Sequence, residues 1–227
     1  MVLGVRDSSP QKGTNLCSLR LERSVLKLGY RFIAGIDEVG RGALFGPVCA
    51  AAVILNAKKV PKGINDSKKL TPKQRELLAE NIKESALAYS IAFIEAKIVD
   101  EINILQATFE AMRKAIDGLT SSPDFLLCDG MPIPNCDIPM RAIVKGDTLS
   151  MSIAAASILA KVERDFLICS LATEFPGYDL VNNKGYGTER HLQALAQLGP
   201  TELHRHTFRG ARIEDFSELI SKDSEWL

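Results

Sequence analysis

The chain has 227 residues, of which 46% are hydrophobic and 25% are charged, with 28 basic and 28 acidic side chains. This length and apolar content exclude a disordered or fibrous protein and predict a globular chain of α/β size with a sizeable core. Because the formal charges cancel, net charge alone indicates neither nucleic acid nor any other partner.

The distribution of charge along the chain is more informative than its sum. Between Lys58 and Arg75 there are seven basic residues and one acid, whereas residues 214–227 contain five acids and one lysine. A basic stretch of this kind is usually a solvated face, but it also fits a surface that contacts phosphates.

The cysteines and the apolar segments bear on the cellular compartment. None of the five cysteines form a Cys-x-x-Cys pair, which favours a reduced cytosolic protein over a disulfide scaffold or a zinc site. No stretch approaches the roughly 20 apolar residues of a membrane span, and the first thirty residues lack the apolar core of a signal peptide. We therefore expect a soluble, cytoplasmic protein that makes no contact with a membrane.

The chain begins with a segment that predicts little structure. Residues 1–18 are polar, with Gly, Ser and Pro, and residues 19–28 have the spacing of a short helix. We therefore assign residues 1–30 to an N-terminal tail with a short helix. Residues 31–227 are expected to form a single domain.

Two apolar runs, at residues 32–36 and 48–55, predict buried strands. The second is almost continuously apolar, as in a strand that is covered on both faces. Three glycines and Pro47 lie between the runs and supply the turn chemistry of a hairpin.

Helices and strands alternate after the hairpin. Residues 70–86 predict a helix, because Thr71 is a good N-cap, Pro72 suits the first helical position and Gln74 completes a capping box. The pattern then predicts a strand, a helix, two short strands and two helices, at residues 86–96, 97–118, 124–129, 141–144, 149–175 and 188–199. Without internal repeats, this order implies one α/β domain with a mixed sheet.

Four acids follow predicted strands. Asp37 and Glu38 end the first apolar run, Asp129 closes the run at 124–129, and Asp147 precedes the long helix. Each has an ordinary alternative: a hairpin pair for the first two, an Asx-turn for Asp129 and a helix N-cap for Asp147. Because functional residues often lie where a rigid sheet ends, acids at three strand ends favour one shared site.

Converging carboxylates predict a hard divalent cation. Like charges raise one another's pKa values, and Mg²⁺ prefers oxygen ligands. Because successive strand side chains point to opposite faces, Asp37 and Glu38 serve one centre only where the strand ends, or if one contributes its backbone carbonyl. No histidine or cysteine spacing suits zinc, and we expect His204 and His206 at the surface or near a phosphate.

Several sequence blocks resemble those of the ribonuclease HII family and occur in the same order. They are GIDEVGRG, NDSKKLT, LCDG, IVKGD with SIAAASILAKVERD, and NKGYGT, which together extend over about Arg31 to Phe208. The resemblance implies an RNase H-like fold, with a mixed five-stranded sheet flanked by helices and a C-terminal helical region. Departures from the family pattern at Ala43, Phe45 and Asn183 concern loop geometry and leave the acids intact.

The resemblance also implies a function. The implied function is that of a metal-dependent endonuclease, which cleaves the RNA strand of RNA–DNA hybrids and also cuts at single ribonucleotides embedded in duplex DNA. Cleavage leaves 5′-phosphate and 3′-hydroxyl ends. The implied cofactor is Mg²⁺ or Mn²⁺, with two ions in the active complex, and we expect a monomer. The family's catalytic, metal-binding acids match Asp37, Glu38, Asp129 and Asp147. The implied substrate-binding residues are Gly40, Arg41, Gly42, Lys68, Lys69, Lys145, Lys161 and Tyr186.

The chemistry of these residues suits such roles. Glycines at positions 40 and 42 permit positive φ and a close backbone approach to a 2′-hydroxyl, and Arg41 suits a phosphate. Tyr186, between two glycines, is expected to be exposed and free to stack on a sugar or base. The lysines are either solvated or contact phosphates, which position a duplex without reading it.

Two other functions stay open at this point. A DNA-processing nuclease or strand-transfer enzyme of the same superfamily would cut an all-DNA duplex. A catalytically silent nucleic-acid-binding protein would gain nothing from four acids that face phosphates. On the long helix, Ser150, Ala154, Ser157 and Lys161 share a face, which indicates close packing on the sheet or a lysine that reaches toward the acids.

Overall fold

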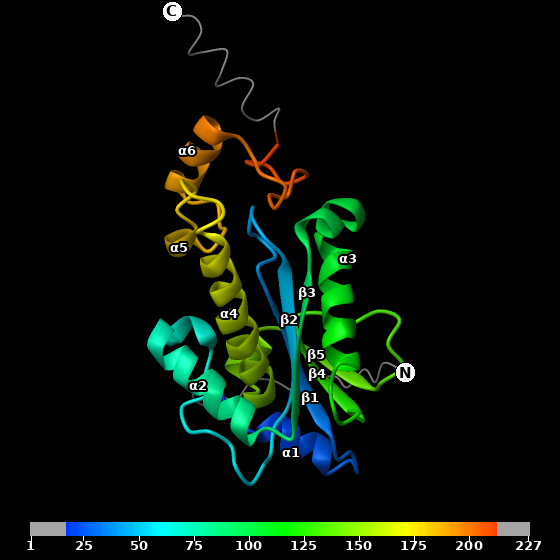
Figure 1. Ribbon diagram of the computed structural model, residues 1–227. Coiled ribbons are helices and arrows are strands. Elements are labelled where there is room, and N and C mark those ends of the chain that lie inside the picture. Colours follow the sequence, from blue (N-terminus) through cyan, green and yellow to red (C-terminus); the bar gives the residue numbers. More distant parts are fainter. Residues whose placement is uncertain (1–16, 213–227) are drawn as a thin grey trace, which may run out of the picture. The chain divides into compact units, whose positions relative to one another are not determined.

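The computed structural model describes residues 17–212 (Figure 1). Of the polar segment at residues 1–18, only residues 17 and 18 are described. The segment at residues 214–227 lies outside the described residues. Two compact units make up the described chain, and the prediction of a single domain over residues 31–227 stays a prediction. The first unit contains residues up to Val39, Ala50–Ala92 and Phe109–Val162, and the second contains Gly40–Cys49, Phe93–Thr108 and the residues from Glu163 onward.

Helices and strands alternate along the described residues as the sequence predicts. The strands are β1 (Ile33–Val39), β2 (Val48–Ile54), β3 (Ala88–Ile94), β4 (Phe125–Asp129) and β5 (Met140–Ile143). The α-helices are α1 (Arg20–Leu26), α2 (Pro72–Ser85), α3 (Ala96–Asp117), α4 (Met151–Leu171), α5 (Leu180–Asn183) and α6 (Glu189–Leu198). Two 3₁₀ turns, η1 (Ser67–Lys69) and η2 (Gly146–Thr148), complete the set.

The five strands form one sheet in the order β3-β2-β1-β4-β5, which confirms the predicted mixed five-stranded sheet. Strand β4 runs parallel to both of its neighbours, β1 and β5. Since parallel strands end at the same edge of a sheet, the residues that end β1 and β4 become neighbours. The first strand runs to Val39, so that Asp37 and Glu38 lie within its last three residues and not after it.

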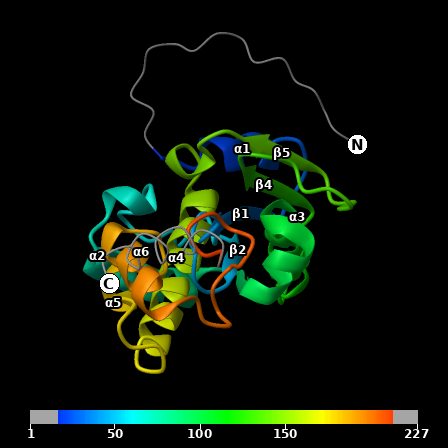
Figure 2. The same ribbon diagram turned by 90° about the horizontal axis from the view of Figure 1, so that it is seen from above.

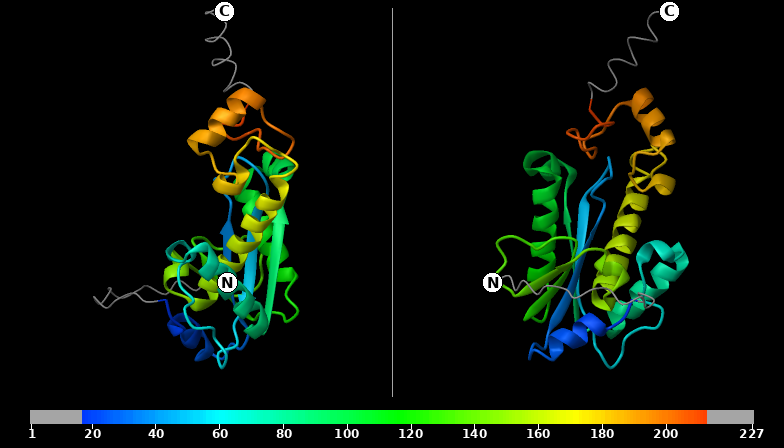
Figure 3. Two further views of the ribbon diagram at one scale, coloured as in Figure 1. Left: turned by 60° about the vertical axis from the view of Figure 1, so that its left-hand side comes forward. Right: turned by 180° about the vertical axis from the view of Figure 1, so that it is seen from behind.

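Helices cover both faces of the sheet in the first unit. The first half of α4 and the second half of α3 lie on opposite sides of the strands (Figures 1 and 2, and Figure 3, right). Helix α4 approaches β1 so closely that a Cβ atom on Gly35 would lie 2.0 Å from the carbonyl carbon of Ser152. Only glycine fits there, and this contact fixes the distance between α4 and the strand that carries Asp37.

Local capping determines where several helices begin and end. The Thr71 side chain accepts from the Gln74 backbone N–H, and the reciprocal bond of the capping box is present, as predicted. Helix α6 likewise begins after Thr188, whose side chain accepts from the His191 backbone N–H, and ends at Gly199. Helix α3 has a kink at Asn103, where φ is 66°.

The start of α4 is capped by a residue from the N-terminal helix. Glu22 of α1 is buried, and its Oε1 accepts hydrogen bonds from the Ser150 hydroxyl at 2.6 Å and the Ser152 backbone N–H at 2.9 Å. A carboxylate satisfies unpaired N–H groups at a helix N-terminus and suits the positive end of the helix dipole. Asp147 lies in η2, so this end of α4 does not use it as the cap.

All five cysteines are free thiols, and Cys17, Cys49 and Cys128 are buried. Burial raises the pKa of the Cys128 thiol to about 12, so it behaves as a small apolar side chain. No helix among residues 17–212 combines the length and the apolar character needed to cross a membrane.

We predict that Glu22→Ala lowers the free energy of unfolding by about 1–3 kcal/mol, because two buried donors at the start of α4 lose their acceptor. The loss is measured by urea unfolding. Glu22→Gln retains an oxygen acceptor and should cost less than the alanine variant. Glu76 is exposed on α2, and Glu76→Ala, the matched control, should change stability by less than about 0.5 kcal/mol. Equal effects of Glu22→Ala and Glu76→Ala would contradict the capping role.

Candidate active site

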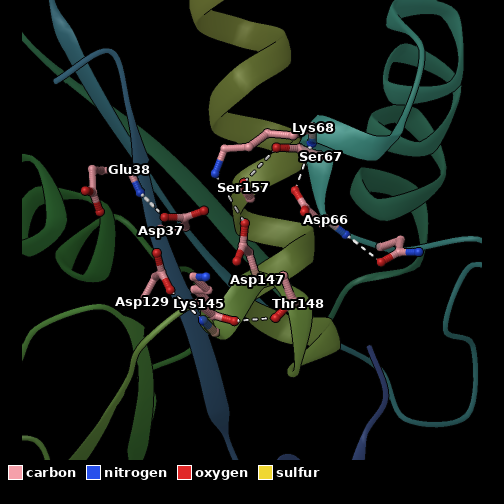
Figure 4. Close-up of polar contacts among 12 residues, drawn as sticks. Asp37, Glu38, Asp66, Ser67, Lys68, Asp129, Lys145, Asp147, Thr148 and Ser157 are labelled. Carbon is pink, nitrogen blue, oxygen red and sulfur yellow. Dashed lines mark hydrogen bonds and ion pairs between the residues drawn. The ribbon is translucent and has the colours of Figure 1, made fainter. Parts of the chain in front are cut away.

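Three aspartates converge at one edge of the sheet, and we call Asp37, Asp129 and Asp147 the carboxylate cluster (Figure 4). The parallel register pairs Ile36 with Cys128, so Asp37 and Asp129 are the next residues on adjacent strands, which lie about 4.8 Å apart. Their side chains therefore share one face of the sheet.

The turn η2 brings the third aspartate to this pair. The Gly146 backbone N–H donates a hydrogen bond of 2.6 Å to Oδ1 of Asp129. Asp147, the next residue, is buried and points toward the other two carboxylates (Figure 4). The Asp129 side chain thus holds a turn seventeen residues away in the sequence, rather than forming a local Asx-turn.

Glu38 hydrogen-bonds the cluster through its backbone, and the charge of its carboxylate also acts on Asp37. Its backbone N–H donates to Oδ1 of Asp37 at 2.7 Å, while its side chain lies on the other side of β1, away from Asp147 (Figure 4). Because both residues lie inside β1, the alternation of strand side chains separates the two carboxylates. The two side chains therefore do not share one direction, and which groups of Glu38 serve a metal stays a prediction.

Burial and mutual repulsion make the cluster electrostatically unfavourable without a cation. Burial raises the pKa of Asp37 well above its usual range, and the charges of Glu38 and Asp129 raise it further, against hydrogen bonds with Ser157 and the Glu38 backbone. Burial also raises the pKa of Asp129, helped by the charge of Asp147 and opposed by the Gly146 N–H and by Lys68. A positive charge placed among these carboxylates would stabilise their ionised forms.

One lysine already supplies part of that charge. The Lys68 ammonium lies 3.6 Å from Oδ2 of Asp147, although its side chain is 84% exposed. Burial alone would lower the pKa of Lys68, but the combined charge of Asp147, Asp66, Asp37 and Asp129 outweighs it, so the pKa is raised. The exposed ammonium therefore faces the whole cluster, and solvent screening keeps its pair with Asp147 weak.

Hydrogen bonds behind Lys68 fix the turn that carries it. Asp66 is buried and accepts from the Lys68 backbone N–H at 2.9 Å, as a cap of η1. The Ser67 hydroxyl lies 3.0 Å from the Ser157 hydroxyl of α4, and Ser157 in turn hydrogen-bonds Asp37. The sequence did not reveal these structural roles of Asp66 and Ser67. The signal for Asp66 was present, because an aspartate side chain often accepts a hydrogen bond from the backbone N–H two residues later, as in an Asx-turn.

The other predicted lysines lie at or near the surface. Lys69 and Lys145 are exposed, and Lys161 is half-buried on α4. Lys145 has a left-handed backbone, with φ of 56°, and its carbonyl accepts from the Thr148 hydroxyl at 2.7 Å. That backbone shapes the turn before Asp147 and leaves the ammonium in solvent.

The donor set of the cluster suits a hard divalent cation. Among residues 17–212, no group of three or more His, Cys, Asp or Glu side chains is arranged so that it could hold a metal ion. The cluster nevertheless offers only carboxylate oxygens, the ligands that Mg²⁺ prefers, and a cation among them would offset the repulsion that helps to raise the pKa values of Asp37 and Asp129. The chemistry fits such an ion.

In the second unit, two segments that carry the remaining predicted residues are bound to each other. We call residues 40–47 the glycine loop and residues 183–187 the tyrosine turn. The Gly185 carbonyl accepts from the backbone N–H groups of Leu44 at 2.8 Å and Phe45 at 3.1 Å, and Ala43 forms a β-bridge with Tyr186. Gly185 has φ of +84°, and a Cβ there would lie 2.5 Å from the Phe45 carbonyl oxygen, so only glycine fits this junction.

The glycine loop and the tyrosine turn carry those expected substrate contacts that are not lysines. Gly40 is buried with φ of +87°, whereas Arg41 and Gly42 are exposed. Tyr186 is half-buried rather than fully exposed, because the Arg164 guanidinium lies 5.5 Å from its ring centroid. Asn183, where the chain departs from the family pattern, accepts from the Gly185 N–H at 2.7 Å and so shapes the tyrosine turn.

Two buried histidines also reach the tyrosine turn, and the expectation of a surface position is wrong for His204. The Thr201 N–H donates to Nδ1 of His204, so the His204 proton is on Nε2, which lies 3.2 Å from Nε2 of His191. Nδ1 of His191 then donates to the Tyr186 carbonyl oxygen at 2.9 Å. Burial lowers the pKa of His204 to about 3, so this relay is neutral. His206 is exposed, as expected.

Comparison with known proteins identifies close sequence relatives. A family model described as Ribonuclease HII matches residues 34–211. A ribonuclease HII of Caldicellulosiruptor bescii is 52% identical over 188 residues, which cover 83% of this chain and 91% of the relative. A ribonuclease HII of Solibacter usitatus is 49% identical over 203 residues and covers 89% of each chain. The match therefore includes the carboxylate cluster, the glycine loop and the tyrosine turn.

Solved structures share the fold. The crystal structure of ribonuclease H2 from Pyrococcus horikoshii OT3 has a TM-score of 0.70 at 25% identity and covers 84% of this chain and 99% of its own. RNase HII from Archaeoglobus fulgidus, solved as a complex with PCNA, has a TM-score of 0.66 at 27% identity, with coverage of 81% and 100%. Bst-RNase HIII in complex with Mn²⁺, at 19% identity and a TM-score of 0.66, shows the likeness of fold alone. The predicted RNase H-like fold is confirmed.

We predict that Asp37→Asn raises the melting temperature of the metal-free protein, and more at pH 8 than at pH 5. The pKa of Asp37 is raised in the folded state, so its favourable contribution to stability is present below the unfolded pKa and is lost as pH rises through the folded pKa. At pH 8 the carboxyl of the unfolded chain is ionised whereas the folded state resists ionisation, so Asp37 destabilises the fold there, and asparagine removes this effect. Thermal unfolding in excess chelator measures the effect.

The matched control for this measurement is Asp137→Asn, because Asp137 is exposed. It should leave the melting temperature almost unchanged at both pH values. A lower melting temperature for Asp37→Asn at pH 8 would mean that the hydrogen bonds of the carboxylate outweigh its burial and repulsion.

Proposed function

Since the chain belongs to the ribonuclease HII family, endonucleases that act on RNA–DNA hybrids, we propose that it cuts the RNA of such hybrids and single ribonucleotides embedded in duplex DNA. The reaction depends on divalent metal ions and leaves a 5′-phosphate and a 3′-hydroxyl. The observation that carries the proposal is the convergence of Asp37, Asp129 and Asp147 at one edge of the sheet (Figure 4). A buried Asp37 and a half-buried Asp129, both with a raised pKa, suit catalysis with a cation and offer nothing to passive binding of phosphates.

The cluster would hold two ions, Mg²⁺ or Mn²⁺, through the side chains of Asp37, Asp129 and Asp147. Glu38 would contribute its backbone carbonyl, because its carboxylate points away from the other three. Bound there, a pair of divalent ions supplies an activated water and neutralises charge on the scissile phosphate. The chain's own task is to hold the carboxylates in place, which it does through the register of β1 and β4 and the Gly146 N–H.

The lysines bind and orient the duplex in this proposal. Lys68 is exposed but directed toward Asp147, so its ammonium is placed to contact a phosphate brought to the cluster. Lys69, Lys145 and Lys161 would contact other phosphates and fix the register of the strand without reading its sequence. An arginine at position 41, exposed on the glycine loop, adds a bidentate phosphate contact.

The glycine loop and the tyrosine turn would distinguish RNA from DNA. A Cβ on Gly42 would meet nothing within 4 Å, and its φ is not in the left-handed region, so the protein itself does not require glycine there. A glycine that the fold does not need suits close approach of another molecule, such as a 2′-hydroxyl that hydrogen-bonds the loop backbone. The half-buried Tyr186 ring would stack on the neighbouring nucleotide.

We predict that the protein cuts a continuous RNA–DNA hybrid and a duplex with one ribonucleotide in the presence of Mg²⁺ or Mn²⁺, and that excess chelator stops both reactions. Asp129→Asn should slow both by about a hundredfold or more, which corresponds to about 2.7 kcal/mol. The asparagine retains the oxygen that accepts from Gly146, so the fold is spared while the charge is lost. Gel assays of labelled duplexes measure the rates.

An all-DNA duplex and the Asp137→Asn variant are the controls for this experiment. Cleavage of the all-DNA duplex would favour a DNA-processing nuclease of the same fold. Full turnover in chelator would refute the metal assignment, and an intact enzyme that leaves the lone ribonucleotide uncut would refute the finer substrate assignment.

We predict that Gly42→Ala leaves the melting temperature unchanged, because the added methyl group meets open space, but lowers kcat/KM. The loss should be about tenfold, or about 1.4 kcal/mol, on the duplex with one ribonucleotide. It should be smaller on the continuous hybrid, which offers many registers. Unchanged rates at unchanged stability would show that no substrate group approaches Gly42.

A further inference from the structure

Arg164, a residue to which neither the sequence analysis nor the proposed function gives a role, is fully buried on the second half of α4. Its Nε donates to the Pro47 carbonyl at 2.9 Å and its Nη2 to the Phe45 carbonyl at 3.0 Å, both in the glycine loop. Its Nη1 donates to the Lys184 carbonyl of the tyrosine turn at 2.9 Å. One guanidinium therefore binds the two segments that are expected to contact the ribonucleotide.

The same side chain also touches the residues on which recognition would depend. Its Cζ lies 5.5 Å from the centroid of the Tyr186 ring, within the range of a cation–π contact. A Cβ on Gly40 would lie 2.1 Å from its Nε, so the loop backbone packs directly on the guanidinium. Arg164 thus contacts the start of the glycine loop, its end, the tyrosine turn and the aromatic ring.

Stability by itself does not account for an arginine at this position. Burial lowers the pKa of Arg164, and its three hydrogen-bond acceptors are backbone carbonyls rather than carboxylates. Well-packed apolar side chains often stabilise a core at least as well as a buried charge does. A guanidinium offers something different, a rigid planar fork of donors that fixes the relative positions of its acceptors.

A second buried arginine reinforces the same loop. Arg205 is also fully buried, and its Nε and Nη1 donate to the Gly46 carbonyl at 3.1 Å and the Arg41 carbonyl at 2.9 Å. The glycine loop therefore has four of its carbonyls held by two guanidinium groups. Arg164 alone of the two also binds the tyrosine turn.

We propose that Arg164 is a positioning residue that sets the distance between the glycine loop and the Tyr186 ring, so that both engage adjacent nucleotides at a lone ribonucleotide. The inference rests on the proposed function of these two segments. Because Arg164 is buried, it acts through the loop carbonyls and the tyrosine ring and does not touch the substrate itself.

The test is a double-mutant cycle of Arg164→Lys and Tyr186→Ala on a duplex with one ribonucleotide. Lysine keeps the charge, but its single ammonium cannot reach three carbonyls in the geometry of a fork. Arg164→Lys should lower kcat/KM by roughly tenfold in the intact background and by less than about threefold when Tyr186 is already alanine, since coupled residues are not additive. Additive losses would overturn the proposal, because they indicate a general structural role.

The matched control is Arg113→Lys. Arg113 also donates to a backbone carbonyl, that of Pro134, but it lies on α3 in the first unit. Its substitution should leave the kinetics unchanged in both backgrounds. If Arg164→Lys does not fold, Arg164→Gln, which removes the buried charge, takes its place in the cycle. Failure of both variants to fold would overturn the proposal, because Arg164 would then serve stability alone.

A readout that does not require cleavage separates this inference from the proposed function. With 3-fluorotyrosine incorporated, the Tyr186 resonance, assigned by Tyr186→Phe, should be single and sharp in the intact protein. It should shift or broaden in Arg164→Lys and not in Arg113→Lys. An unchanged resonance refutes the positioning role even if the enzyme cuts a lone ribonucleotide. An enzyme that leaves this substrate uncut refutes the assignment of the lone ribonucleotide as a substrate, whatever the resonance does.

Discussion

Two carboxylates stand side by side in this protein because β1 and β4 pair in parallel, with Ile36 opposite Cys128. The register places Asp37 next to Asp129 at one edge of the sheet, where strand spacing alone holds two like charges close together. The rest of the cluster is arranged around this constraint. The Gly146 N–H donates a hydrogen bond to Asp129, and the Lys68 ammonium faces Asp147. Both groups carry positive charge or partial charge, so they stabilise the ionised aspartates.

Helix α4 carries polar groups that act within each of the two units. Its first half packs on β1 at Gly35 and carries Ser157, a hydrogen-bond partner of Asp37. Its second half carries Arg164, which binds the glycine loop and the tyrosine turn. The close contact of this first half with β1 therefore also holds Ser157 beside Asp37.

The second unit holds its loops with buried polar groups that lack opposite charges. Arg164 and Arg205 bind backbone carbonyls, and the His191–His204 pair is kept neutral by burial, which lowers both pKa values. Such groups contribute little net stability compared with apolar packing, but each demands a defined partner. Loops built in this way have one preferred geometry, which suits the recognition of a single hydroxyl group that we propose for them.

The sequence by itself determined the order of the main strands and helices, the cap at Thr71 and the acids at strand ends, because periodicity and capping depend on neighbours a few residues away. The roles expected of those acids came from the family resemblance. Only the tertiary structure decided that the Glu38 carboxylate turns away, that His204 is buried, and that Arg164 binds a carbonyl 117 residues distant. The physical reason is that a polar side chain is buried only where a partner is supplied, and these partners come from segments that are remote in the sequence.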